Sequence, residues 1–311
     1  MKKIIGVLLL TFALINARAQ LTPGNQMFLF NPVLVNPSLA GLHNGQAQLA
    51  YDTRWIGLDG APKTAFLRYD KSFSGNTGWD VAVTSDRLGP MSTMSLANCF
   101  SFFVQIRDEE RLAFGIRHHI TQSYLNLSIN QLIDPTDPLL AANQTGIPVN
   151  NFDASVSYYN PEKYMVGFSY INLIPQPRFR FTNTVEQPVL SLHGWYAQDI
   201  GADMALEAYA LFTSSPNTKM NINIGCMGTL QQKFGAGLNF SPANQIGIFA
   251  YIRATERLSV FYNYNLPISD IYKVSKQSHA IGLSFRVGQE TLSGTRFLLQ
   301  PTNESTSNRM F

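Results

Sequence analysis

Apolar and polar residues alternate with a period of two along most of this chain, in short segments separated by clusters of Gly, Pro, Asn and Asp. The longest segment, 94–106, places Leu96 and Phe100 on one face and Cys99 and Ser101 on the other. Successive side chains of a strand point to opposite sides of a sheet. The pattern therefore predicts strands with one apolar and one polar face.

About fourteen segments carry this alternation, and closed barrels of bacterial outer membranes have an even number of strands. The predicted strands are 47–55, 64–70, 79–86, 94–106, 112–121, 152–159, 164–172, 189–198, 204–212, 220–230, 234–240, 245–253, 259–265 and 279–287. A polar stretch at 126–151 lacks the period, which predicts a long ordered loop beyond the barrel wall.

Composition separates a membrane barrel from a soluble β-protein. Charged residues make up only 14% of the chain, against about 25% in soluble domains. No run of about 20 apolar residues follows the N-terminal leader, which excludes a bundle of membrane helices. Strands that meet lipid on one side and a polar interior on the other produce both features. We expect an all-β fold, a transmembrane antiparallel β-barrel that closes on itself because unpaired strand edges are costly in lipid.

The N-terminus predicts export. Lys2 and Lys3 precede an apolar run at 4–15 that ends in a small-x-small cleavage site, with cleavage between Ala19 and Gln20. The run is too short to span a bilayer, and no Cys follows the site to accept a lipid. We expect a signal peptide that is removed from an exported protein.

The expected organisation follows from these boundaries. A signal peptide occupies 1–19, an N-terminal segment 20–45, the outer-membrane barrel 46–287 and a polar tail 288–311. The tail is rich in Thr, Ser, Asn and Gln, so we expect it outside the barrel, with one more strand at 296–300 as the alternative.

Two Asn-Pro pairs, Asn31-Pro32 and Asn36-Pro37, stand in the N-terminal segment. Proline disfavours helical geometry for the residue before it and lacks a backbone donor. Each Asn is therefore expected to be extended or in a turn. The apolar residues between the pairs can then pack into a cavity, which predicts a segment that lines or plugs one barrel mouth. A loop that caps a soluble core is the alternative.

A second block of motif residues lies at 54–64, and a turn at 86–90 reads Asp-Arg-Leu-Gly-Pro. With these residues the sequence resembles the PorP/SprF family of the type IX secretion system, found in Bacteroidetes. The matching residues are Gln26, Met27, Asn31, Pro32, Asn36, Pro37, Ala40, Gly41, Arg54, Trp55, Gly57, Gly60, Ala61, Pro62, Thr64, Asp86, Gly89 and Pro90. The resemblance continues through 112–116 and Ser278-His279, with departures at Thr53 and Ala280 and a long tail.

The resemblance implies an outer-membrane component of protein secretion, surrounded by outer-membrane lipid. Its members take part in exporting cargo proteins or holding them at the surface, and in some the cargo is a gliding adhesin with a C-terminal sorting domain. The resemblance also implies partners among the periplasmic components of the secretion system.

The sequence offers little chemistry, and we expect no enzyme, no cofactor and no metal site. The five histidines, at 43, 118, 119, 193 and 279, accompany no HExxH, CxxC, GxSxG or P-loop pattern. His118 and His119 are adjacent in a predicted strand and so face opposite sides. Net charge is +3 without a basic run, which argues against nucleic acid as a partner. A small-solute porin is the main alternative function, and a hydrolase that uses His193 or His279 is the third.

Inward-facing charges at Asp52, Arg54, Asp80, Asp86 and Arg117 allow two interpretations. They could line a pore, or they could pair with one another, because buried charges need partners of opposite sign. We favour pairing.

Only two cysteines are present, Cys99 and Cys226, and both fall in predicted strands. An exported chain with two cysteines can form a disulfide. Two buried free thiols are the simpler expectation.

Overall fold

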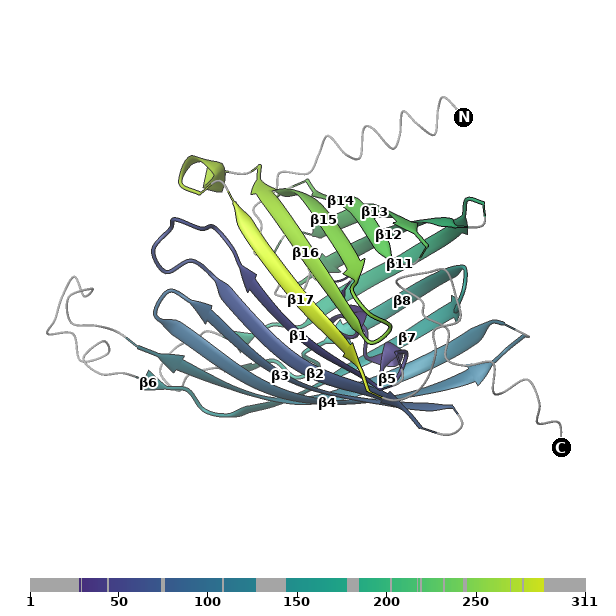
Figure 1. Cartoon of the computed structure of the whole chain (residues 1–311). Coiled ribbons are helices and arrows are strands. Elements are labelled where there is room, and N and C mark those ends of the chain that lie inside the picture. The colour runs from purple at the N-terminus through teal and green to yellow at the C-terminus, as the bar shows by residue number, and fades with distance from the viewer. Residues whose placement is uncertain are drawn as a thin grey trace, which may run out of the picture.

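Fourteen antiparallel strands form a closed ring in the computed structural model (Figure 1). It describes residues 28, 30–43, 45–73, 76–107, 109–126, 144–177, 185–201, 203–216, 218, 220–231, 233–242, 245–268, 270–275 and 277–287. The strands of the ring are β1 (Gln46–Thr53), β2 (Lys63–Ser72), β3 (Thr77–Leu88), β4 (Met91–Gln105), β5 (Arg111–Leu125), β7 (Val149–Asn160), β8 (Tyr164–Ile171), β11 (Val189–Asp199), β12 (Met204–Ser214), β13 (Asn221–Leu230), β14 (Phe234–Ser241), β15 (Gln245–Arg253), β16 (Leu258–Pro267) and β17 (Ser278–Arg286).

The predicted strands are confirmed, with differences at their ends. Strand β4 begins at Met91 and β5 extends to Leu125, beyond the predicted limits of 94 and 121. Polar residues dominate these extensions. The alternation of apolar and polar residues therefore fades there, although the strands stay hydrogen-bonded to each other. Strand β7 begins at Val149, inside the stretch predicted as a loop. The remaining elements are β6 (Gln144–Thr145), β9 (Gln176–Pro177), β10 (Val185–Glu186) and the short 3-10 helix η5 (Asp270–Lys273).

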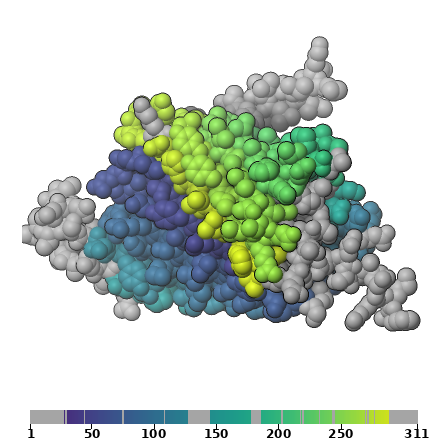
Figure 2. All heavy atoms as spheres, viewed as in Figure 1, coloured from purple at the N-terminus to yellow at the C-terminus, as the bar shows by residue number. Residues whose placement is uncertain are grey.

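The first and last strands close the ring. Strand β1 pairs with β17 from Gln46 opposite Arg286 to Thr53 opposite His279. Figure 2 shows the purple first strand against the yellow last strand. Pairing leaves the wall without an open edge in lipid. Within the described part of the chain, no helix has the length and apolar character needed to cross a membrane.

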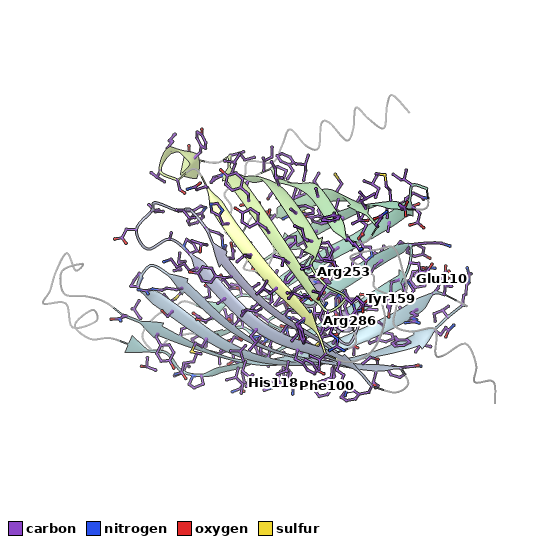
Figure 3. All side chains as sticks on the ribbon, in the orientation of Figure 1. Phe100, Glu110, His118, Tyr159, Arg253 and Arg286 are labelled. Atoms are coloured by element: carbon purple, nitrogen blue, oxygen red, sulfur yellow. The ribbon has the colours of Figure 1, made fainter. Side chains whose placement is uncertain are left out.

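The outer face of the ring is apolar, as the alternation predicted. Leu96, Phe100, Ile116, Val166 and Leu238 are each more than half exposed. Phe100 and His118 point outward at the lower edge of Figure 3. His119, next in sequence, is buried on the inner side, so the prediction that the two histidines face opposite sides is confirmed.

An arginine on this face should destabilise the barrel. Ile116 is 61% exposed and pairs with Phe100 and Ala154, far from the strand ends. We expect Ile116→Arg to cost about 2–4 kcal/mol of unfolding free energy, because it places a charge deep in lipid. Ile200→Arg, in the turn after β11, is the control and should cost at most about 1 kcal/mol. Urea titration in lipid vesicles, followed by tryptophan fluorescence, measures both, and equal losses would contradict a lipid-facing wall.

The two ends of the ring differ. At the end where β1 begins and β17 finishes, the strands are joined by connections of three to five residues. At the other end the connections after β5 and β8 run through 126–148 and 172–188. We call these the turn end and the loop end. Outer-membrane barrels have short periplasmic turns and long outer loops, so the turn end faces the periplasm.

One turn carries a hydrogen-bonded polar cluster on the outside of the barrel. Glu110 accepts hydrogen bonds from the hydroxyls of Tyr158 and Tyr164. These bonds hold the pKa of Glu110 below its usual value, that from Tyr158 contributing most. Aromatic rings with a polar tip are typical of the membrane boundary, which agrees with the position of this turn at the edge of the wall.

The inner face has two unlike halves. On β11–β16 it carries large buried side chains, among them Trp195, Tyr209 and Phe249. On β3 and β4 the inward residues are small, such as Ala82 and Ser101. The lumen therefore has unfilled space beside β1–β5, and the N-terminal residues occupy part of this space.

Candidate functional site

The N-terminal segment, defined here as residues 30–43, contacts the inner wall of the barrel. It contains two short 3-10 turns, η2 (Pro32–Leu34) and η3 (Pro37–Leu39). Turn η3 packs against β4, β5 and β7. In Figure 1 this purple segment is seen within the ring of strands. That it plugs one mouth stays a prediction.

The Asn-Pro pairs shape this segment as expected. Asn31 and Asn36 are N-caps with φ of −142° and −131°, so neither is helical, and Asn36 is extended before its proline. The side chain of Asn36 accepts a hydrogen bond from Ser38 N at 3.1 Å and donates one to Ser157 Oγ at 2.6 Å. Proline fits the first helical position because it lacks a donor that the turn does not need. Each pair therefore starts a turn.

Inward-facing glycines of the wall let the segment approach closely. A Cβ on Gly115 of β5 would lie 2.5 Å from Ser38 Cα. One on Gly78 of β3 would lie 2.6 Å from the carbonyl carbon of Ala40. Both distances are far shorter than van der Waals contact, so only glycine permits this packing.

Hydrogen bonds and apolar contacts add to the fit. Ser38 N donates to Ser155 Oγ at 2.7 Å, and Ser101 Oγ donates to Ala40 O at 2.6 Å. Gly41 N donates to Asp70 at 2.6 Å. The ring of Phe30 stacks on Phe261 with centroids 5.3 Å apart. The segment is thus held by both polar and apolar groups.

Arg68 of β2 is the centre of the largest ion-pair network in the described part of the chain. Its guanidinium bonds to Asp80 at 2.7 Å and to Asp70 at 3.0 Å. It also donates to Asn31 Oδ1 at 2.7 Å and to Gln48 Oε1 at 3.0 Å. The side chain is among the most buried in the protein. Arg68 therefore connects the N-terminal segment to three strands.

Arg117 of β5 forms a second centre. Its Nε donates to Asp153 of β7, and its Nη1 donates to the carbonyls of Val33 and Leu34 at 3.1 and 2.9 Å. His119 Nδ1 lies 3.5 Å from the same Asp153 carboxylate. Arg117 thus holds η2 against the wall.

A third pair lies toward the loop end. Arg54 Nε is 3.0 Å from Asp52 Oδ2, and Thr64 donates to Asp86 at 2.5 Å. The prediction that inward charges are paired is confirmed for Asp52, Arg54, Asp80 and Arg117, while Asp86 has a hydroxyl partner. Sequence reasoning did not single out the partners Arg68 and Asp153.

A cavity of about 200 Å³ remains beside this network. Its walls come from β1–β5, and Asn31, Val33 and Leu34 of the N-terminal segment form one side. No group of three or more His, Cys, Asp or Glu side chains in the described ranges is placed to hold a metal ion.

Comparison with known families decides what this barrel is. Residues 17–285 match the family described as "Type IX secretion system membrane protein PorP/SprF". The chain belongs to the PorP/SprF family. It is therefore an outer-membrane β-barrel of the type IX secretion system, and the family resemblance drawn from its motifs is confirmed. A comparison with curated proteins found no match.

Three solved structures are similar to this PorP/SprF chain. The CymD monoaromatic hydrocarbon channel has a TM-score of 0.51 and 11% identity, covering 88% of this chain and 95% of that one. The toluene transporter TbuX of Ralstonia pickettii gives 0.49 and 9%, with 84% and 93% covered. Omp33 of Acinetobacter baumannii gives 0.48 and 11%, with 79% and 100% covered. The likeness to CymD, at 11% identity, shows the barrel fold alone.

The second block of PorP/SprF motif residues lies at the loop end. Trp55 N donates to Ser278 Oγ at 3.1 Å, and Gly89 N donates to Gly60 O at 2.8 Å. Three segments far apart in sequence, the β1–β2 loop, the β3–β4 turn and the start of β17, therefore meet. The left-handed φ angles of Gly57, Gly60 and Gly89, 96°, 73° and 56°, suit glycine. Arg54 N donates to Pro62 O at 3.0 Å, which joins the two ends of the β1–β2 loop.

Pro90 continues this turn. The carbonyl of Pro90 accepts from Asn126 N at 2.9 Å, which joins the β3–β4 turn to the end of β5. The motif residues thus form two groups, one in the lumen and one at the loop end. That they carry function stays a prediction.

Several predicted residues lie outside the described ranges. They are the signal peptide with Ala19 and Gln20 of its cleavage site, Gln26 and Met27 of the first motif, residues 127–143 of the predicted long loop, and the tail from 288 with its alternative strand.

The cysteines are free. Cys99 is buried and its Sγ donates to Pro37 O at 3.2 Å, whereas Cys226 is exposed on the outer face. The expectation of two buried thiols is therefore wrong for Cys226, because it occupies a lipid-facing position of β13.

Proposed function

We propose that this PorP/SprF protein acts as a non-enzymatic docking barrel that binds cargo proteins and periplasmic secretion components. The observation that carries the proposal is the tight fit of residues 30–43 against the inner wall. Backbone groups of this segment pack onto Gly78 and Gly115. Arg117 donates to the carbonyl of Val33, and Arg68 donates to the side-chain oxygen of Asn31. A barrel with its lumen occupied in this way is suited to present surfaces rather than to pass solutes.

The two ends offer different surfaces for partners. The turn end faces the periplasm, where scaffold components of the secretion system would meet it. The loop end carries the second motif group and exposes Ile56 and Leu58. Cargo, in gliding bacteria adhesins with a C-terminal sorting domain, would meet the barrel there.

Loss of the gene should test the role in secretion. We expect deletion to abolish the surface or medium pool of at least one protein with a sorting domain, which quantitative proteomics of cell-surface and medium fractions measures. Re-expression from a plasmid should restore it. Normal export of all such proteins would overturn the proposal.

Photo-crosslinking should separate the two surfaces. A photoreactive amino acid at Ile200, in a turn at the turn end, should capture periplasmic secretion components. The photoreactive amino acid placed at Ile56, at the loop end, should capture a secreted protein. Ile116, which faces lipid, is the matched control and should capture neither. Mass spectrometry of the adducts identifies them, and identical partners at all three positions would contradict the assignment.

The small-solute porin is the second candidate, because a cavity remains in the lumen. Planar bilayers distinguish the two functions. The docking barrel should pass almost no current, whereas a porin would show stable open steps.

A further inference from the structure

The lumenal cavity opens toward the loop end. Along β4, inward-facing Cys99 and Ser101 are buried beside the N-terminal segment, while Thr93, Ser95 and Ala97 are half-buried. Inward residues of β3 change in the same direction, from buried Asp80 to half-buried residues at 84 and 86. The cavity of about 200 Å³ is larger than the about 150 Å³ that hold a benzene molecule. It has room for a ligand entering from the outer side.

The charges around the cavity do not balance. The charged residues that line it are Asp52, Asp80 and Arg117, with His119 charged only when protonated. Together with the groups bonded directly to them and to lining Thr64, they comprise four carboxylates, at 52, 80, 86 and 153, and three guanidinium groups, at 54, 68 and 117. An excess of negative charge in a poorly solvated place favours a cation.

Two cavity-lining residues have polar atoms without a hydrogen-bond partner in the described part of the chain. Asp52 is 5% exposed, and its Oδ1 has no partner although Oδ2 faces Arg54. Asn31 is 1% exposed, and its Nδ2 has none. Its amide orientation is fixed, because Oδ1 accepts from Arg68. Buried polar atoms are normally satisfied, so unsatisfied ones call for an explanation.

We propose that this cavity is a binding site for a guanidinium or ammonium group that has a hydrogen-bond acceptor near it. Asp52 binds the cation, and Asn31 Nδ2 donates to the acceptor. Thr64 and Ser95 supply hydroxyls on the walls. The chemistry fits a basic side chain of a polypeptide, with its carbonyl as acceptor, or a small free cation. The site does not depend on the proposed docking role.

Calorimetric titration of the full-length protein in detergent tests the site. The probes are ethylguanidinium and the capped tripeptide Gly-Arg-Gly, with Gly-citrulline-Gly as an uncharged isostere. We expect saturable one-to-one binding of a guanidinium probe and at least about tenfold weaker binding of the citrulline peptide, because the buried carboxylate loses its partner. If the arginine peptide binds more tightly than ethylguanidinium, the natural ligand is a polypeptide. If the two bind equally, the natural ligand is a small cation.

Three variants localise the site. Asp52→Asn should weaken binding at least about tenfold. Asp59→Asn, which changes an exposed carboxylate in the loop after β1, should leave binding unchanged. Ala97→Leu fills the cavity without altering a charge and should also weaken binding, which keeps the test valid if Asp52→Asn misfolds. No saturable binding, equal binding of citrulline and arginine, or equal losses in Asp52→Asn and Asp59→Asn would each overturn the proposal.

Discussion

Replacing Arg68 with methionine should lower the free energy of unfolding by about 3–5 kcal/mol, the cost of leaving buried charges without their partner. Methionine keeps much of the length of the side chain but none of its donors. Asp70 and Asp80 would lose a cation at 3.0 and 2.7 Å. Asn31 Oδ1 would lose its donor as well.

Urea titration in lipid vesicles measures this loss, with the shift between folded and unfolded bands in unheated gels as a second readout. Arg107→Met is the matched control. Arg107 is 78% exposed and lies 3.7 Å from Glu110, so its loss should cost at most about 1 kcal/mol. An Arg68→Met protein as stable as Arg107→Met would show that the network contributes little.

Replacing Gly115 with valine should displace the N-terminal segment from the wall. The new Cβ would lie 2.5 Å from Ser38 Cα, and the atoms it meets are backbone. A rigid neighbour cannot yield as a flexible side chain does, so either the segment or β5 must move. Overpacking of this kind costs about 1–3 kcal/mol.

Protease sensitivity and bilayer conductance detect the displacement. We expect Gly115→Val to expose residues 30–43 to added protease and to pass current where the wild type does not. Gly228→Val is the control, because a Cβ on Gly228 of β13 would meet no atom within 4 Å. Identical protease patterns for the two variants would contradict close packing of the segment on β5.

The barrel itself could be predicted because its physical cause is local. Lipid on one side and a polar lumen on the other impose a period of two, visible in single segments such as 94–106. Closure of the barrel could be predicted because the unpaired backbone groups of an open sheet edge are costly in lipid. Strand ends were less predictable, since residues such as Gln122 and Ser123 in β5 continue the ladder with little apolar alternation.

The lumenal site could be predicted only in part. The Asn-Pro pairs indicated extended geometry and packing, but not which wall they meet. Arg68 and Asp70 lie on one face of a predicted strand. Which residues they bond to, Asp80 and Asn31 among them, depends on how the strands and the N-terminal segment pack in three dimensions. Inward glycines at 78 and 115 were an available signal, because a strand glycine often marks close approach of another backbone.

A disulfide between the N-terminal segment and the wall tests the central claim most directly. Ser38 Oγ lies 2.7 Å from Ser157 Oγ, so cysteines at both positions can bond when Cys99 and Cys226 are replaced by alanine. Peptide mass spectrometry of the protein oxidised in its own membrane should find the 38–157 cross-link in most molecules. Its absence, with both cysteines free and the barrel folded, would contradict a lumen occupied by residues 30–43.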